Sequence, residues 1–313
     1  MTKAIEILNQ DTQEITLTPD IFERFIKYVD VKPASLKTYK KAIKNYYSFL
    51  NERGLVDNQT RQTVLAYRDY LRENYSSSTV NLYISAVRQF YSWLNVETNG
   101  AVADLAKGIK GAKTTRGFKK DYLTSSQVVS VMSVIDTDSL QGLRDFALMY
   151  LLFTGGLRTI EVVRANIEDL QTQGGKSMLY VQGKGKDDKG DYIVIVPECE
   201  NAIRAYLTSR EEKDLTAPLF ASCSNNSNGN RLTTRSISRI VKDYLKEVGL
   251  NSDRLTAHST RHTAATLALL GGSSLQEVQQ FLRHSSITTT QIYSHNLNAL
   301  NNTAALNIAA QIG

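Results

Sequence analysis

Residues 107–120 divide the chain into two parts that must fold separately. Their sequence, KGIKGAKTTRGFKK, is rich in lysine and glycine and contains almost no apolar side chains. A segment of this composition offers little surface to a buried core and is typical of a linker between domains. A chain of 313 residues is long enough for two domains. We therefore predict one domain over residues 16–106 and a second domain over residues 121–313.

The part before the linker predicts four amphipathic helices. Pro33 interrupts the chain after the first helix, and Ser35 begins the second. Thr60 precedes the third helix, and the serine run 76–78 precedes the fourth. Apolar residues recur at helical spacing in each segment. Four such helices with short connections predict a small helical bundle.

The part after the linker predicts a helical domain with a small antiparallel sheet. The apolar segment from Asp145 to Phe153 predicts a helix at the centre of the core. Residues 178–182 and 192–196 alternate or run apolar on either side of a turn, GKGKDDKG, and therefore predict a strand pair. Residues 218–220 add a third short strand. The expected fold class is mainly α with a small antiparallel β-sheet.

Histidine and arginine side chains gather near the carboxyl end of the chain. All four histidines lie between residues 258 and 295. His258 and Arg261 are three residues apart and share one face of a helix. His284 follows the next helix, and Tyr293 comes later in a run of small polar residues. A phenol, two imidazoles and a guanidinium brought together can perform acyl or phosphoryl transfer without a metal ion.

A second guanidinium comes from the segment TGGLRTIE. Arg158 follows a double glycine at a helix junction there, and Glu161 lies one turn further on. The boxes TGGLRTIE, HSTRH and LRHSSITTTQIYSH, in this order, resemble the tyrosine recombinase family, which includes phage integrases, Xer and Cre. An HxxR pattern alone is weak, but HxxR followed by a histidine and a tyrosine at this spacing is specific.

The resemblance implies a site-specific recombinase that cuts and rejoins DNA through a 3′-phosphotyrosyl intermediate, serving integration, excision or resolution. It makes Tyr293 the nucleophile. It assigns Arg158 and Arg261 to the non-bridging phosphate oxygens, which guanidinium groups bind in bidentate fashion. It assigns His258 and His284 to hydrogen bonds with the phosphate and to the proton of the tyrosine.

Three further residues follow from the same resemblance. Lys184, in the turn of the predicted strand pair, is the candidate general acid for the 5′ oxygen, and Lys186 remains its alternative. Glu161 is expected to orient Arg158, because a carboxylate beside the phosphate would repel it. Arg283 stands before His284 where glycine is usual. Since glycine allows a positive φ, the arginine predicts a slightly different backbone or an additional phosphate contact.

The amino-terminal bundle resembles the core-binding, SAM-like domain of the family, and the second part resembles its DNA breaking-rejoining catalytic domain. A basic stripe on the second helix, with one arginine on the fourth, is the expected phosphate-contacting face. A solvated face is the alternative interpretation of a lysine stripe on its own. The residues of this face are Lys37, Lys40, Lys41, Lys44 and Arg88.

Charge and composition support a nucleic-acid partner. The net charge of +6 favours a polyanion, here double-stranded DNA with paired recombination sites. The chain has neither a long apolar run nor a signal peptide, which predicts a cytoplasmic protein without membrane contact, associated with the nucleoid when active. No carboxylate cluster suits Mg²⁺, so neither a metal site nor a cofactor is expected.

The tail after Tyr293 carries spaced apolar side chains. The resemblance implies that it docks on a neighbouring protomer as an exchange helix. Protomers that are monomeric in solution would then assemble as a homotetramer on DNA. A helix folded back on its own domain is the alternative.

Two other functions remain open from the sequence. The first is a type IB topoisomerase-like relaxing enzyme, against which the amino-terminal bundle and the tail argue. The second is a catalytically inactive DNA-binding protein on the same scaffold, although a pure binder needs no phenol. The DNA target sequence and the choice between integration, resolution and inversion do not follow from the residues.

Overall fold

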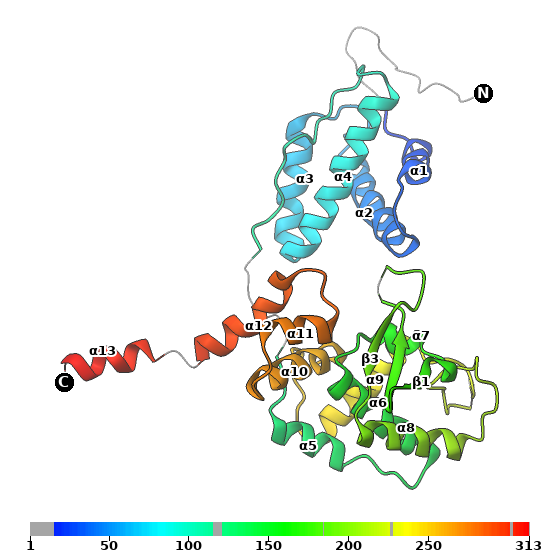
Figure 1. The fold of residues 1–313 in the computed structure, drawn as a ribbon. Helices are drawn as coiled ribbons and strands as arrows, with labels where there is room; N and C mark the ends of the chain where they lie inside the picture. The colour runs from blue at the N-terminus through cyan, green and yellow to red at the C-terminus, as the bar shows by residue number, and fades with distance from the viewer. Residues whose placement is uncertain (1–15, 115–120, 184, 226–227, 301–302, 313) are drawn as a thin grey trace. The chain divides into compact units, whose positions relative to one another are not determined.

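The computed structural model describes residues 16–114, 121–183, 185–225, 228–300 and 303–312 (Figure 1). The chain divides into two compact units, Met1–Arg116 and Gly117–Gly313. Helices dominate both units, and a three-stranded antiparallel sheet lies in the second. The predicted fold class is therefore confirmed. Within the described residues, no helix is both long enough and apolar enough to cross a membrane.

The amino-terminal unit is built on four helices, as the sequence predicts. They are α1 (Pro19–Tyr28), α2 (Pro33–Glu52), α3 (Arg61–Asn74) and α4 (Ser77–Glu97). Aromatic side chains fill the space between them: Phe22 stacks on Phe90 with ring centroids 4.7 Å apart. The buried hydroxyls of Tyr46 and Tyr91 satisfy each other with a hydrogen bond of 2.8 Å. These large rings lie in one buried core together with aliphatic side chains of all four helices.

The start of α2 differs from the prediction. The helix begins at Pro33, not at Ser35, and its N-cap is Lys32. The backbone N–H groups of Ser35 and Leu36 both donate to the Lys32 carbonyl. Proline is compatible with the first helical turn because its missing N–H would have no intrahelical partner there, and its fixed φ is already helical.

The first residues of the predicted linker contact the amino-terminal unit. The Ile109 side chain is buried in the bundle core. Arg61 donates to the Lys107 carbonyl at 2.7 Å, and Arg72 donates to the Gly111 carbonyl at 2.7 Å. The remainder of the predicted linker, residues 115–120, lies outside the described residues.

The second unit is organised around α6. Its helices are α5 (Ser125–Ser133), α6 (Leu140–Gly155), α7 (Thr159–Arg164), α8 (Pro197–Arg210), α9 (Thr234–Glu247), α10 (Ala257–Leu270), α11 (Leu275–Leu282), α12 (Ile287–Leu300) and α13 (Ala304–Ile312), with a 3-10 turn η1 at Ile167–Asp169. Helix α6 packs against α8 on one side and α10 on another. Most of its side chains are buried, which confirms the predicted central helix. This packing brings the end of α6 close to the helix that carries His258 and Arg261.

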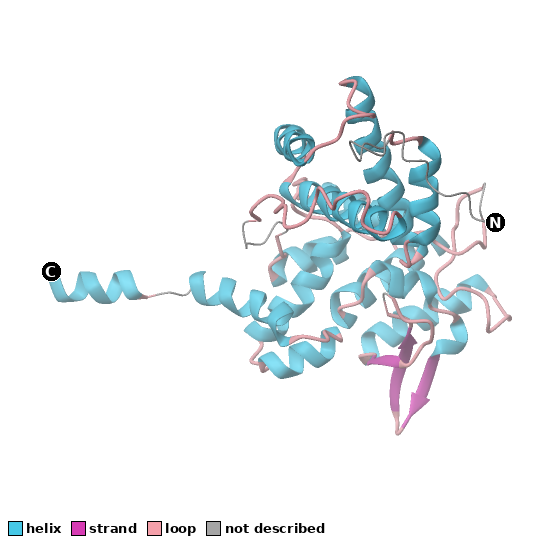
Figure 2. Cartoon of the chain, turned by 90° about the horizontal axis from the view of Figure 1, so that it is seen from above, coloured by secondary structure: helices cyan, strands magenta, loops and turns pink. Residues whose placement is uncertain are grey.

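The sheet runs in the order β1 (Leu170–Gln173), β2 (Lys176–Val181) and β3 (Asp191–Val194), drawn in magenta in Figure 2. Leu179 of β2 pairs with Leu170 on one side and Ile193 on the other. The predicted strand pair corresponds to β2 and β3. The segment GKGKDDKG connects these two strands.

The third strand is not the predicted one. Residues 218–220 form only an isolated bridge, between Pro218 and Asn166. The third strand is β1, whose sequence LQTQ is mostly exposed and lacks an apolar alternation. It is joined to β2 by Gly174 and Gly175, which both have positive φ, 57° and 75°. Two such residues suit a tight hairpin turn, and this turn was the local signal for β1.

Candidate active site

A sharp turn between α6 and α7 places Arg158. Gly156 ends α6 in the left-handed conformation, with φ 55°. A Cβ at this position would lie 2.7 Å from the Phe281 ring, so only glycine fits both the conformation and the space. Arg158 follows as the N-cap of α7, and its guanidinium side chain remains 30% exposed. The turn therefore presents a cation that a ligand can reach.

Glu161 fixes Arg158 from one turn further along α7. Its carboxylate accepts the Arg158 backbone N–H at 2.8 Å and the Arg158 guanidinium at 2.9 Å. The Glu161 side chain is only 1% exposed. A buried carboxylate with two charge-assisted hydrogen bonds holds its partner in one orientation. Glu161 thus lies where it can orient Arg158.

Arg261 lies on the buried face of α10. Its guanidinium donates to the main-chain carbonyls of Gly156 and Leu282, from two other helix ends. It lies 3.9 Å from the Glu161 carboxylate. Burial and the charge of Arg158 lower the pKa of Arg261 to about 10, so the group stays positive at neutral pH. Helix packing therefore fixes a second guanidinium beside the first.

Arg283 joins the same carboxylate, which the sequence analysis did not foresee. It is the C-cap of α11 and has φ 55°, so the left-handed backbone expected for glycine is kept by an arginine. The expectation of a different backbone was wrong. Its guanidinium donates to Glu161 at 3.0 Å and to the Phe281 carbonyl at 2.8 Å.

His284 follows directly and is oriented by a hydroxyl. Its Nδ1 lies 2.9 Å from Oγ1 of Thr290, a side chain that is fully buried. Burial and the charges of Arg261 and Arg158 lower the pKa of His284 to about 4. The imidazole is therefore neutral at physiological pH. Sequence reasoning missed Thr290, because nothing local distinguishes it from the neighbouring threonines.

Tyr293 projects from α12 into a small apolar cluster with Ala265, Val278 and Leu282, and is 5% exposed. Its ring lies parallel to the His284 ring, with centroids 6.5 Å apart. Burial raises the pKa of Tyr293, and the positive charges of Arg261 and Arg158 oppose that rise. The phenol is therefore protonated at neutral pH, in an environment where the guanidinium groups favour its anion.

Two further imidazoles, of His262 and His258, lie near Tyr293. The His262 ring is 5.3 Å from the Tyr293 ring and 4.8 Å from the His258 ring. His258 is exposed and His262 is partly buried. Burial and the nearby charge of His258 lower the pKa of His262 to about 4. The side chain of His295 lies outside the described residues.

The hairpin lysines are held by carboxylates where the structure describes them. Lys186 contacts both carboxylate oxygens of Asp191 at 2.8 Å, and Lys189 pairs with Asp169. Lys184, the candidate general acid, lies outside the described residues. The choice between Lys184 and Lys186 therefore stays a prediction.

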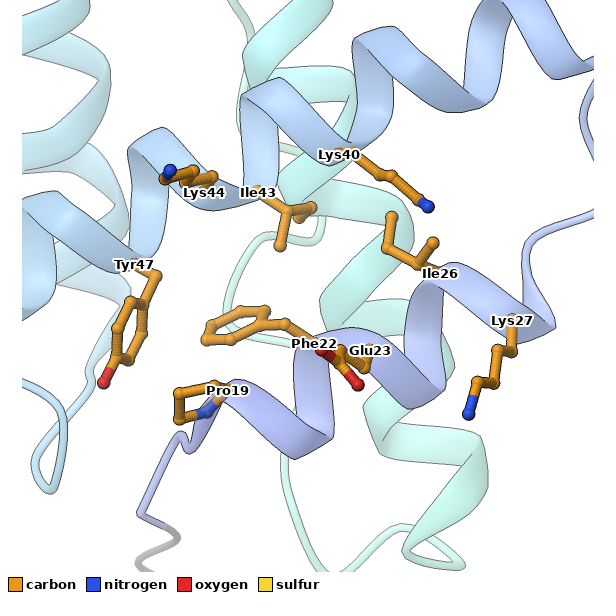
Figure 3. Close-up of a pocket in the computed structure, with 9 residues that line it drawn as sticks. All are labelled: Pro19, Phe22, Glu23, Ile26, Lys27, Lys40, Ile43, Lys44 and Tyr47. Atoms are coloured by element: carbon orange, nitrogen blue, oxygen red, sulfur yellow. The ribbon is translucent and has the colours of Figure 1, made fainter.

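The predicted DNA-binding face of the amino-terminal unit is solvent exposed. All five of its side chains are exposed: Lys37, Lys40, Lys41, Lys44 and Arg88. Figure 3 shows a groove between α1 and α2, of about 590 Å³, with Lys40 and Lys44 among the side chains that line it. Phe22 and Ile43 supply part of its apolar lining. The stripe thus combines exposed positive charges with an apolar groove.

The site of the second unit suits phosphoryl transfer. It combines fixed guanidinium groups, neutral imidazoles and a phenol, which are the groups needed to hold a phosphate, move a proton and attack phosphorus. Among the described residues, no group of three or more histidine, cysteine, aspartate or glutamate side chains is placed to hold a metal ion.

Comparison with known proteins agrees with this chemistry. Residues 121–299 match the model of the Phage integrase family, and residues 20–98 match that of the Phage integrase N-terminal SAM-like domain. The chain belongs to the phage integrase family. The resemblance seen in its sequence is confirmed, and the chain is a tyrosine recombinase.

Curated relatives match this recombinase over most of its length. It is 30% identical to tyrosine recombinase XerD of Listeria monocytogenes serotype 4b (strain F2365), with 88% of this chain and 94% of the relative covered. It is 32% identical to tyrosine recombinase XerC of Pelobacter propionicus (strain DSM 2379 / NBRC 103807 / OttBd1), with 85% of this chain and 86% of the relative covered.

Solved structures share the fold at lower identity. XerH recombinase bound to a palindromic difH substrate, in a post-cleavage complex, has a TM-score of 0.73 and 20% identity, with 87% of this chain and 79% of that chain covered. A lambda integrase dimer bound to a COC′ core site has a TM-score of 0.67 and 17% identity, with 88% of this chain and 94% of that chain covered.

Proposed function

We propose that this recombinase cleaves DNA by attack of the Tyr293 hydroxyl on a phosphodiester of its recombination site. A bond forms between the tyrosine oxygen and phosphorus, and the bond from phosphorus to the 5′ oxygen breaks. The observation that carries this proposal is the position of Tyr293. Its ring is parallel to the His284 ring, and the charges of Arg261 and Arg158 are close enough to act on its phenol. The phosphotyrosyl link keeps the energy of the phosphodiester, so a second 5′ hydroxyl can reverse the step on a new strand.

The two arginines are assigned to the charge that develops on phosphorus. Arg158 keeps a partly exposed guanidinium, and Arg261 is held by the Gly156 and Leu282 carbonyls. Donors that are already oriented stabilise a pentavalent phosphorane without reorganising during the reaction. Glu161 supports both from a buried position and does not need to touch the substrate.

The protons are assigned to the imidazoles and a lysine. The Nδ1 atom of His284 is hydrogen-bonded to the Thr290 hydroxyl, which leaves Nε2 for the phosphate or for the tyrosine proton. Because its pKa lies near 4, His284 is neutral before DNA binds and can accept that proton. His258 is exposed and can hydrogen-bond the phosphate. Lys184 is assigned to protonate the departing 5′ oxygen, with Lys186 as its alternative.

The partner is assigned as double-stranded DNA carrying paired sites, on which monomers assemble into a homotetramer, associated with the nucleoid. Helix α13 supports this assembly, because its Leu306, Ile308 and Ile312 are 70%, 61% and 83% exposed. An apolar groove of about 430 Å³ on α5 and α6, lined by Val128, Met132, Phe146 and Tyr150 among others, is of matching chemistry. No observation favours the topoisomerase or the inactive binder.

A covalent-adduct assay tests the nucleophile. A binding site is first selected from a pool of random-sequence duplexes, then synthesised with a nick that traps the cleaved strand. Wild type incubated with this duplex in EDTA should yield a protein–DNA adduct on a denaturing gel, and Tyr293→Phe should yield none. Tyr28→Phe, which removes an exposed hydroxyl in the other unit, should behave as wild type. An adduct that survives in Tyr293→Phe would assign the nucleophile elsewhere.

A further inference from the structure

One buried carboxylate serves three guanidinium groups in this protein. Glu161 contacts Arg158 and Arg283 by hydrogen bonds and lies 3.9 Å from Arg261. The Arg261 and Arg283 side chains are only 2% and 9% exposed. A single negative charge therefore balances three positive charges in a largely buried cluster. In such a cluster, the position of each cation depends on the carboxylate that they share.

Arg283 holds this place at a conformational cost. Its φ of 55° lies in the left-handed region, which disfavours residues with a Cβ. Its guanidinium contact with Glu161 ties the end of α11 to α7, and its contact with the Phe281 carbonyl holds it against α11 itself. Since His284 is the next residue, the same contacts also fix the position of the His284 backbone.

We propose that Arg283 is a positioning residue that holds the Glu161 carboxylate and, through it, the spacing of Arg158 and Arg261. This inference rests on the proposed function. Arg283 occupies the Glu161 oxygen that also faces Arg261. Without it, that oxygen keeps only the Arg158 backbone N–H as a hydrogen-bond donor and can form a closer ion pair with Arg261. The carboxylate would then rotate, and Arg158 would lose the orientation in which it grips the phosphate.

The variant Arg283→Gly tests the inference, because glycine adopts the same backbone without strain. We expect the rate of adduct formation at saturating DNA to fall about ten-fold or more, since small misplacements of catalytic groups are costly. The DNA dissociation constant should stay within about two-fold, because the exposed basic groups remain. The melting temperature should not fall, since relief of strain and of cation repulsion offsets the lost bonds. Arg283→Lys should recover part of the rate.

A double-mutant cycle with Glu161→Gln separates positioning from direct contact. If Arg283 acts through Glu161, Arg283→Gly should slow cleavage far less in the Glu161→Gln background than in wild type. An equal loss in both backgrounds would overturn the inference and indicate that Arg283 contacts the phosphate directly. The Nε of Arg283 is buried and has no hydrogen-bond partner among the described residues, so this atom would be the donor to examine.

Two other outcomes also contradict it. Unchanged cleavage in Arg283→Gly would mean that the spacing of the cluster does not depend on this side chain. A loss of rate that tracks a loss of melting temperature would mean a purely structural role. Both leave the proposed function intact, because the wild-type adduct would still form. Absence of the wild-type adduct would overturn the proposed function and this inference together.

Discussion

The guanidinium cluster around Glu161 and the lysine stripe of α2 both carry positive charge, but they hold it differently. Arg158 and Arg283 are hydrogen-bonded to a buried carboxylate, and Arg261 is fixed by two main-chain carbonyls. The four lysines of the stripe are exposed, and none forms an ion pair with another described residue. One region is arranged in the protein itself, whereas the other carries exposed charges that no ion pair among the described residues fixes.

This difference matches two different tasks. Stabilising a transition state requires donors that do not have to reorganise, and buried hydrogen bonds provide them. Binding a polyanion requires only that positive side chains can move to reach the phosphates. The affinity of such binding depends strongly on salt concentration. We therefore expect cluster variants to change the rate of cleavage and stripe variants to change affinity. Lys186 and Lys189 lie between these extremes, since they follow β2 in its connection to β3 but are paired with carboxylates.

The largest expected effect concerns the hairpin. Lys184→Ala should slow cleavage by about 10²–10⁴, the usual loss when a general acid is removed. A 5′-phosphorothiolate duplex should restore the rate, because a thiolate leaves without protonation. Lys186→Ala is the matched control, since Lys186 is already engaged by Asp191. If the 5′-phosphorothiolate duplex restored the rate of Lys186→Ala and not that of Lys184→Ala, Lys186 would be the general acid.

A smaller effect is expected from the stripe. The double variant Lys40→Ala, Lys44→Ala should weaken DNA binding and lower the slope of log affinity against log salt by about 2, near one for each lost phosphate contact. The cleavage rate of the bound complex should not change. Lys213→Ala, an exposed lysine of the other unit, serves as the control. An unchanged salt slope would assign the stripe to solvent, not to DNA.

The smallest effect is a pH dependence of stability in the second unit. Burial holds the pKa of His262 and His284 near 4, below the unfolded value near 6.5. Between these values the unfolded chain binds more protons, so the melting temperature should fall as pH drops from about 6.5 toward 4. Charged groups around His284 are Arg261, Arg158, Arg283 and Glu161.

Two variants check this assignment by thermal unfolding in buffers of low anion content. His262→Gln and His284→Gln should each flatten the dependence between pH 4.5 and 6.5, whereas Lys40→Ala should not. An equally steep fall in a variant that lacks both imidazoles would assign the dependence to carboxylates. The pH dependence of stability would then no longer distinguish the buried site from the exposed lysine stripe.

Much of the helical framework was predictable from local residue patterns. The capping box of Thr124 and Gln127 and the start of α11 at Leu275 follow from polar residues placed before apolar runs. Such signals are local, because a helix start is a contact between residues three apart. Where the local pattern was weak the prediction failed: β1 is a polar edge strand, and the proline at the start of α2 was taken for a break.

The sequence by itself determined the family, because the order and spacing of the arginine, HxxR, histidine and tyrosine boxes are specific in combination. Only the tertiary structure decided that Arg158, Arg261 and Arg283 share Glu161, and that Thr290 orients His284. The bond from Arg283 to Glu161 joins residues 122 apart in the chain. A contact of that range is set by how the helices pack, with α11 on α10 and α10 on α6, and no periodicity along the chain encodes it.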